Sequence, residues 1–243
     1  MNLKQGLGRV EITSGEALLS TAAKARYDGL ADWYDDRFVI GSDPHQPGLP
    51  ELLGPGSGPC LDIGCGTGRN FETIRASGRE VVGLDYSADQ LRLARTRTDG
   101  PLMVGDAAAL PFADESFDTA MVMWISTDVD DFAAVLTDAA RVLRPGGILI
   151  GYGVHPCFNG PHVIYNEDGS RTIHTTYRQP GWHPPAPWWG EDGIRHHIGM
   201  SHVPLAHYLN AFLATGLTLE HFLEPEGPGV PHALAVRARK PNS

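Results

Sequence analysis

The sequence feature that most constrains the fold is a glycine-rich turn in the first half of the chain. A short apolar run at 60–63 leads into Gly64, Gly66 and Gly68, and a helical pattern starts near Asn70. This order is typical of a strand, a tight turn and a helix N-terminus. A Cβ there would disfavour positive φ and would hold a nucleotide-like ligand away from the backbone N–H groups of the helix start. A turn that binds nothing explains one glycine well and three poorly, so the turn predicts a ligand.

From Gly58 onward, strand-like and helix-like patterns alternate. The expected strands are 60–63, 80–84, 102–105, 117–124 and 148–152. The expected helices lie near 70–76, from 87 onward, and over 130–143. This alternation predicts a doubly wound α/β fold, in which helices cover both faces of a parallel, Rossmann-like sheet. A helix at 204–215 and two strands at 217–223 and 232–239 complete the pattern.

Three segments lie outside this alternation. Apolar positions between 14 and 35 fall at roughly helical spacing, so one or two helices begin the chain. Residues 43–59 are rich in proline and glycine and predict a linker without regular structure. Residues 155–203 predict a functional insertion after the fifth strand. We therefore expect an N-terminal helical cap and linker at 1–57 and one larger domain at 58–243.

Composition narrows the classes of function. The formal charge of −10 argues against a general nucleic-acid binder, because phosphate contacts need clustered lysine and arginine. No apolar run approaches the roughly 20 residues that cross a bilayer, and the first residues do not resemble a secretory signal. Three cysteines without metal-ligand pairing fit a reducing compartment. The expected partner is a small molecule, without nucleic acid or membrane, and the expected location is cytoplasmic.

Two acidic residues follow strands at the edge where a ligand is expected. Asp85 ends the second strand, about twenty residues past the glycine turn, where an acid accepts both ribose hydroxyls of an adenosine ligand. Capping of the next helix is its alternative role, but Ser87 already has capping-box spacing to Gln90. Asp106 ends the third strand and is placed to accept from the amine of a purine, with the capping of a turn as its alternative role.

Five motifs together resemble the class I S-adenosylmethionine-dependent methyltransferases, in the small-molecule branch similar to type 11. In order, they are Asp62-Ile63-Gly64-Cys65-Gly66-Thr67-Gly68, Gly83-Leu84-Asp85-Tyr86-Ser87, Gly105-Asp106-Ala107 with Leu110-Pro111-Phe112, Phe117-Asp118, and Leu143-Arg144-Pro145-Gly146-Gly147. The resemblance is strong over residues 27–152. It implies a seven-stranded, mostly parallel sheet with an antiparallel last strand, and S-adenosyl-L-methionine as the cofactor.

The resemblance also implies which residues bind that cofactor. In many relatives a Tyr-Asp-x-x-Ala-x-x-Tyr-Asp segment covers it, and residues 27–35 match this segment closely. A nucleoside triphosphatase would need a Lys followed by Ser or Thr after the glycines, and a dehydrogenase would prefer G-x-G-x-x-G, which is not the spacing here. The expected cofactor-binding residues are Tyr27, Tyr34, Asp62, Gly64, Cys65, Gly66, Gly68, Asp85, Tyr86, Asp106 and Ala107.

The insertion is the expected substrate region, because ten of the eleven histidines lie from His155 onward. A hydroxyl acceptor must lose a proton, and histidine titrates near neutrality. His202 and His155 are therefore the expected general base or substrate-orienting groups, although most histidines in such a segment are solvated or are satisfied core residues. The histidine spacing matches no recognised set of ligands, so no metal is expected. The expected substrate contacts are Trp124, Trp182, Trp188 and Trp189, with a proline-stiffened loop pinned to the core as the equal alternative for residues 181–189.

These observations predict an S-adenosylmethionine-dependent methyltransferase that acts on a small molecule, with transfer to oxygen slightly favoured by the available histidines. Two alternatives stay open. One is transfer to carbon or nitrogen of a small molecule. The other is a non-methylating member of the same fold that binds the cofactor and promotes a cyclisation or a rearrangement. Neither the acceptor nor the oligomeric state follows from the sequence.

Overall fold

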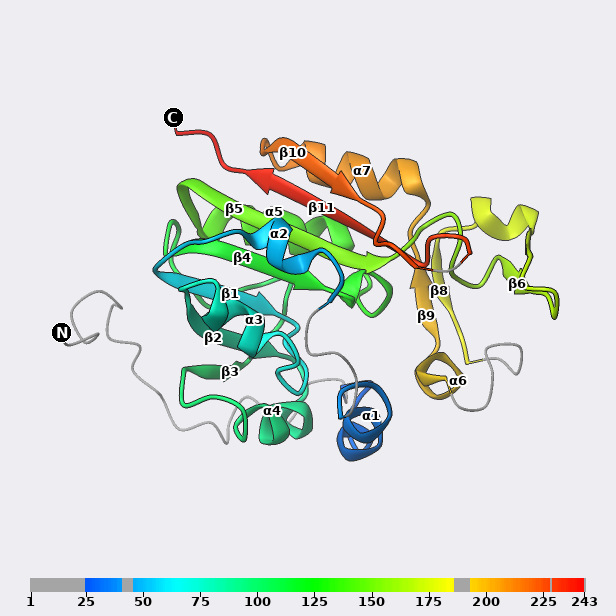
Figure 1. Cartoon of the computed structure of the whole chain (residues 1–243), viewed down its shortest axis with the longest axis horizontal. Helices are drawn as coiled ribbons and strands as arrows, with labels where there is room; N and C mark the ends of the chain where they lie inside the picture. The colour runs from blue at the N-terminus through cyan, green and yellow to red at the C-terminus, as the bar shows by residue number, and fades with distance from the viewer. Residues whose placement is uncertain (1–24, 41–45, 186–192, 228, 243) are drawn as a thin grey trace.

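The fold is built on one seven-stranded sheet (Figure 1). The computed structural model describes residues 25–40, 46–185, 193–227 and 229–242. The strand order is β10-β11-β5-β4-β1-β2-β3. The strands are β1 Pro59–Ile63, β2 Glu80–Asp85, β3 Leu102–Val104, β4 Phe117–Met123, β5 Leu143–Val154, β10 Thr218–Leu223 and β11 Ala233–Arg239. β1 to β5 pair in parallel, whereas β11 runs antiparallel to both β5 and β10, so the predicted doubly wound sheet with an antiparallel last strand is confirmed.

Helices cover both faces of this sheet, and their starts follow the local sequence. One apolar cluster joins the sheet to α5 (Phe132–Val142) and α7 (Leu205–Ala214), and the other joins it to α3 (Phe71–Ala76) and α4 (Ala88–Ala94). The Ser87 side chain accepts from Gln90 N at 3.3 Å and caps α4, as its spacing predicts. Asp131 caps α5 in the same way through Ala134 N at 2.9 Å.

The segment predicted to be an irregular linker contains a short helix, so that prediction is wrong in part. α2 spans Leu49–Leu53 and begins after Gly48, which has φ of 75°. Proline is tolerated in the first turn of a helix because the N–H that it lacks has no helical partner there. The three leucines of α2 are buried against the sheet, and their burial stabilises a helix that local composition disfavours.

Two regions flank the carboxyl ends of the parallel strands. The N-terminal one has a turn at 27–30 and then α1 (Ala31–Phe38), while the part of the predicted helices before residue 25 lies outside the described residues. The insertion after β5 contains β6 (Val163–Tyr165) paired with β7 (Arg171–Ile173), the 3₁₀ helix η3 (Thr175–Arg178), and β8 (Gly181–His183) paired with β9 (Met200–His202). α6 (Ile194–Ile198) lies between β8 and β9, beside α1 in Figure 1.

No helix in the described ranges combines the length and apolar character that crossing a bilayer requires.

Candidate cofactor and substrate site

The glycine turn lies between β1 and α3, at the carboxyl end of the sheet. Gly64 N and Cys65 N both donate to Leu84 O of β2, at 2.8 and 3.0 Å, so the turn is fixed to the neighbouring strand. A Cβ on Gly64 would lie 2.4 Å from Ile125 Cγ2, which requires a glycine there. A Cβ on Gly66 would meet only Gln90 Oε1, at 3.6 Å. The protein therefore leaves no room for a side chain at Gly64, whereas the space beside Gly66 is open.

Asp85 lies beside this open position, and the backbone fixes its carboxylate. Its Oδ2 accepts from Gly66 N and its Oδ1 accepts from Ser87 N, both at 2.8 Å. A carboxylate offers about four lone-pair sites, so the two oxygens keep acceptor capacity for a ligand. Burial raises the pKa of Asp85 to about 6. The arrangement suits a ligand that presents two hydroxyl donors side by side.

Buried polar atoms without partners surround the same turn. They are Asp62 Oδ1, Thr67 Oγ1, Asn70 Oδ1 and both polar atoms of the Gln90 amide. Each of these four side chains belongs to a residue that is at most 5% exposed. A buried polar group without a partner costs about 1–3 kcal/mol, so such groups seldom gather unless a ligand satisfies them. A polar nucleoside-type ligand fits this set.

Gln90 was missed as a site residue because its sequence signal is only that of a helix cap.

Asp62 is the most deeply buried acid of the turn. It is fully inaccessible to solvent, and its Oδ2 receives Asn70 Nδ2 at 3.5 Å. Burial raises the pKa of Asp62 to about 7. A ligand that brings an ammonium group or N–H donors to Asp62 would favour its ionised form.

The residues expected at the adenine end are more exposed. Asp106 follows β3, and its Oδ1 accepts from Ala108 N at 2.8 Å, which is the turn-capping role that was its alternative. Ala107 packs against the apolar cluster under α5. Tyr86 is 44% exposed. Contact of Asp106 and Ala107 with adenine, and of Tyr86 with the cofactor, stays a prediction.

Residues 27–29 lie above the start of α4. Asp28 Oδ1 accepts from Ser87 Oγ at 2.6 Å, and Gly29 N donates to Asp89 Oδ2 at 3.0 Å. The rings of Tyr27 and Tyr34 pack edge to face with centroids 5.5 Å apart. Burial raises the pKa of both tyrosines, and the Asp128 carboxylate adds to the shift. The segment expected to cover the cofactor, residues 27–35, is thus attached next to Asp85.

An ion-pair network in the loop after β4 also escaped sequence reasoning. Tyr27 Oη donates to Asp128 Oδ2 at 3.2 Å, and Arg195 of α6 pairs with the same carboxylate. Arg26 donates to the backbone oxygen of Asp128 and pairs with Asp130 at 2.7 Å. No local pattern marks these residues, because the partners lie far apart along the chain.

The tryptophans expected at the substrate divide into three groups. Trp124 follows β4 with φ of 63°, which is unusual for a bulky residue and is a form of strain that often marks a functional position. Its ring packs against Tyr152 at 5.3 Å and stacks with His232 at 6.4 Å. Trp182 of β8 is 40% exposed and has the Arg26 guanidinium 3.7 Å above its ring. Trp188 and Trp189 lie outside the described residues.

His155 is held through both ring nitrogens. Its Nε2 lies 2.9 Å from Glu224 Oε1, and its Nδ1 accepts from Cys157 N at 3.1 Å. Nδ1 is therefore the unprotonated nitrogen, and Nε2 donates to the carboxylate. His155 is buried against the ring of Phe158. In this arrangement it has no free lone pair with which to accept a substrate proton.

His202 is buried at the end of β9. Its Nε2 donates to Tyr177 O at 2.8 Å, which leaves the lone pair on Nδ1. The ring of His162 lies 4.4 Å away. Burial lowers the pKa of His202 to about 4. His202 also lines a small cavity of about 10 Å³ together with Ser126 and Thr127, so it lies behind the loop that follows β4.

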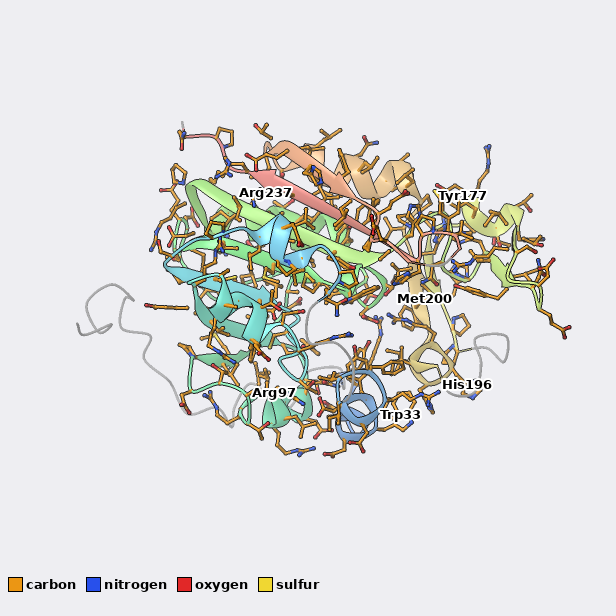
Figure 2. The ribbon with its side chains drawn as sticks, viewed as in Figure 1. Trp33, Arg97, Tyr177, His196, Met200 and Arg237 are labelled. Carbon is orange, nitrogen blue, oxygen red and sulfur yellow. The ribbon has the colours of Figure 1, made fainter. Side chains whose placement is uncertain are left out.

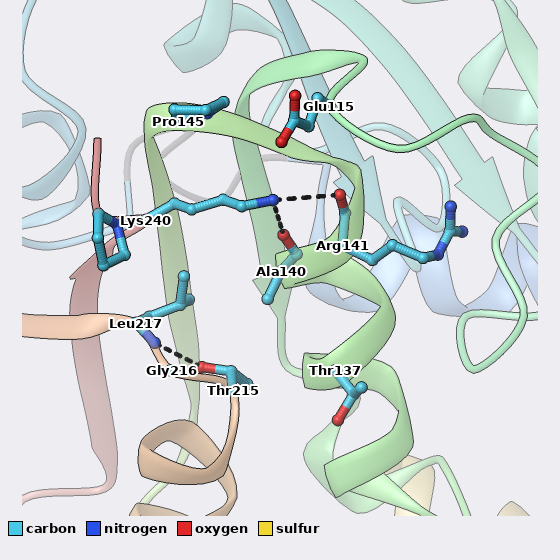
Figure 3. Close-up of a pocket in the computed structure, with 10 residues that line it drawn as sticks. Glu115, Thr137, Ala140, Arg141, Pro145, Thr215, Gly216, Leu217 and Lys240 are labelled. Atoms are coloured by element: carbon cyan, nitrogen blue, oxygen red, sulfur yellow. Dashed lines mark hydrogen bonds between the residues drawn. The ribbon is translucent and has the colours of Figure 1, made fainter. Parts of the chain in front are cut away.

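A larger hollow lies at the opposite edge of the sheet, where β4 and β5 begin (Figure 3). It runs between the end of α5 and the turn between α7 and β10. Lys240 Nζ donates there to Ala140 O at 3.0 Å and to Leu143 O at 2.7 Å, so its charge caps the end of α5. The candidate site residues lie at the other edge.

Over the described ranges, no three side chains of His, Cys, Asp or Glu come together in a group that could hold a metal ion.

Comparison with known proteins agrees with this geometry. Residues 61–151 match the family described as Methyltransferase domain, type 11. A crystal structure of an S-adenosylmethionine-dependent methyltransferase from Mesorhizobium loti superposes with a TM-score of 0.63 at 25% identity, over 79% of this chain and 97% of that one. Residues 61–151 are a methyltransferase domain, and these similarities support a class I S-adenosylmethionine-dependent methyltransferase of the type 11 branch. The cofactor predicted from the sequence, S-adenosylmethionine, is confirmed with it.

Curated relatives match about half of the chain. A demethylmenaquinone methyltransferase from Renibacterium salmoninarum is 33% identical over 137 residues, which are 56% of this chain and 58% of that protein. One from Corynebacterium kroppenstedtii is 42% identical over 119 residues, which are 47% and 50% of the two chains. The chain thus spans about half the length of the curated relatives it matches.

The fold is also similar to that of the [4+2]-cyclase SpnF, with a TM-score of 0.56 at 19% identity over 84% of this chain and 86% of that one. At this identity the similarity concerns the fold alone.

Proposed function

We propose that the chain is an S-adenosylmethionine-dependent methyltransferase that acts on a small, flat and partly apolar acceptor. The observation that carries the proposal is the set of buried, unpartnered polar atoms around the glycine turn, next to the backbone-fixed carboxylate of Asp85. When bound there, S-adenosylmethionine would supply an electrophilic methyl group. Asp85 would accept from the ribose hydroxyls, and Asp62, Gly64, Cys65, Gly66 and Gly68 would surround the methionine part.

The other residues would exclude water and align the acceptor, because methyl transfer from a sulfonium is an in-line displacement that depends on alignment. Tyr27 and Tyr34 would cover the cofactor from the cap segment. At the ends of β4 and β5 and the start of β11, the rings of Trp124 and His232 stack beside the buried Tyr152, and these two rings offer flat surfaces to an aromatic acceptor. The similarity to demethylmenaquinone methyltransferases supports a small ring-containing molecule.

Transfer to oxygen is proposed for an acceptor whose hydroxyl is already acidic. The pKa of His202, lowered to about 4 by burial, makes this histidine neutral and a weak base at pH 7. Such an imidazole orients a hydroxyl through Nδ1 better than it deprotonates an alcohol. A phenol or an enol fits this requirement, whereas an aliphatic alcohol does not.

The direct test is methyl transfer from labelled S-adenosylmethionine to a panel of naphthoquinols, phenols and amines. Labelled product together with S-adenosylhomocysteine would support the proposal. Conversion of an acceptor without release of S-adenosylhomocysteine would contradict it and would favour the non-methylating alternative.

Replacing His202 with alanine should lower turnover of an accepted substrate at least about tenfold and change the affinity for S-adenosylhomocysteine less than about twofold, since the proposed role is to orient the acceptor. Steady-state kinetics and calorimetry measure the two effects. His207→Ala is the control, because His207 is exposed on α7. Equal losses of turnover and cofactor affinity in His202→Ala would make His202 a structural residue instead.

The affinity for S-adenosylhomocysteine should fall as the pH is lowered from 8 to 5. Without ligand, burial raises the pKa of Asp85 to about 6, and ribose hydroxyls donate to its ionised form. Below that pKa a proton must leave on binding, so the affinity should drop by up to about tenfold per pH unit. Calorimetric titrations across this range measure the effect. Constant affinity from pH 5 to 8 would contradict the proposed role of Asp85.

A further inference from the structure

The loop at 127–130, which follows β4, receives contacts from two segments that are far apart in sequence. From the cap segment, residues 25–40, Tyr27 Oη donates to Asp128 Oδ2 at 3.2 Å. From the insertion, Arg195 pairs with the other carboxylate oxygen, and Ser201 Oγ donates to Val129 O at 2.8 Å. Asp128 thus binds the cap segment through Oδ2 and the insertion chiefly through Oδ1, with Arg195 Nη2 also 3.5 Å from Oδ2.

The pair between Asp128 and Arg195 is largely shielded from water. The two side chains are only 16% and 17% exposed. Arg195 Nη2 also donates to Thr127 Oγ1 at 2.7 Å, so its guanidinium is held by two neighbouring residues of the loop. A shielded pair with added hydrogen bonds is screened less by salt than a surface pair and has a defined geometry.

The cap segment and the insertion also contact each other directly. The Arg26 guanidinium stacks on the ring of Trp182, 3.7 Å from its centroid. Trp33 of α1 packs on His197 of α6 with ring centroids 4.7 Å apart, and Figure 2 shows Trp33 next to the neighbouring His196. The two segments therefore form one continuous cover whose shared attachment to the sheet is the loop at 127–130.

The same loop is close to the candidate site. It directly follows η2 (Ile125–Thr127), which begins after Trp124 with its positive φ. The cap segment is attached beside Asp85 through Asp28 and Ser87. A change in the cap segment at Asp85 thus reaches the insertion through the Asp128 carboxylate as well as through the direct ring contacts of Arg26 and Trp33.

We propose that Asp128 is a positioning residue that couples the two covers, so that occupation of the cofactor site orders the insertion in which the acceptor is held. This rests on the proposed function. A ligand under the cap segment would hold Tyr27 where its hydroxyl donates to Asp128. This contact would in turn hold the Asp128 carboxylate in the orientation that binds Arg195. Because coupling of this kind is reciprocal, an ordered insertion should also strengthen cofactor binding.

Hydrogen–deuterium exchange with S-adenosylhomocysteine tests the coupling without an acceptor. In the wild-type chain, the ligand should slow exchange at least tenfold in the glycine turn and also in β8 and β9. In Asp128→Asn, the glycine turn should remain protected, while the protection of β8 and β9 should fall below twofold. Arg195→Gln, which removes the ion-pair partner of Asp128, should lower the protection of β8 and β9 in the same way.

Asp32→Asn is the matched control. Asp32 also joins the cap segment to the body of the protein, through Arg92 at 2.6 Å, but the two side chains are 73% and 51% exposed and the pair does not involve the insertion. In Asp32→Asn, the ligand should protect the glycine turn, β8 and β9 from exchange as it does in the wild-type chain. The proposal is overturned if β8 and β9 are protected equally in Asp128→Asn, or if they are unprotected in the wild type while the glycine turn is protected. Failure of the wild-type chain to bind S-adenosylhomocysteine at all would instead overturn the proposed function, and this inference with it.

Discussion

Replacing Asp85 with alanine should weaken the binding of S-adenosylhomocysteine at least about 100-fold. Two hydroxyl-to-carboxylate hydrogen bonds would be lost, and hydrogen bonds to charged groups contribute about 1.5–3 kcal/mol each. The variant also leaves Gly66 N and Ser87 N without the carboxylate that now accepts from both at 2.8 Å. The glycine turn would lose its fixed position relative to α4. Calorimetric titration with S-adenosylhomocysteine measures the loss.

Glu72→Ala is the matched control for this variant. Glu72 lies on α3, directly after the glycine turn, but its side chain is exposed. The variant removes the same charge next to the same glycine turn, so an affinity within about twofold of the wild type is expected. If Asp85→Ala also stayed within threefold, the ribose hydroxyls would have to bind elsewhere.

Replacing Arg79 with methionine should lower the free energy of unfolding by about 3 kcal/mol. Arg79 is 7% exposed and donates to Leu53 O at 3.1 Å, Gly54 O at 2.8 Å and Thr119 Oγ1 at 2.8 Å. Methionine keeps an apolar stem but leaves these three acceptors without this partner, at about 1 kcal/mol each. For a chain of this size the melting temperature should fall by about 6–12 °C. Thermal unfolding followed by circular dichroism measures the change.

Arg95→Met is the control for Arg79→Met. Arg95 also donates to two backbone carbonyls, Thr98 O at 3.1 Å and Gly100 O at 2.8 Å, but it is exposed. Water replaces these bonds when the side chain is removed, so the free energy of unfolding should change by less than about 0.5 kcal/mol. Equal destabilisation by the two variants would mean that burial of Arg79 is not what makes its hydrogen bonds matter.

The sheet and the place of the glycine turn within it could be predicted because their signals are local. Strand periodicity, the glycine turn and the Ser87 cap each occupy a few consecutive residues, and the structure places them as the sequence predicts. Asp85 needed only its position at the end of β2, because parallel strands end at a common edge. The family resemblance then led from a nucleoside ligand to S-adenosylmethionine.

The features that were missed depend on tertiary contacts. α2 forms because its leucines are buried on the sheet, which outweighs a composition typical of a loop. Asp128 and Arg195 are separated by 67 positions, so no spacing rule connects them. The state of a histidine depends equally on its surroundings. His155 is fully engaged and His202 is neutral at pH 7, and both facts follow from burial and partners that the sequence does not reveal.

The most direct test of the central claim is a crystal structure of the chain with S-adenosylhomocysteine. We predict that both ribose hydroxyls lie within hydrogen-bond distance of the Asp85 carboxylate, at about 2.5–3.0 Å. We also predict that the polar atoms of Asp62, Asn70 and Gln90 that lack partners gain them from the ligand or from water held by it. A ligand bound away from the glycine turn, with Asp85 contacting only Gly66 N and Ser87 N, would contradict the account.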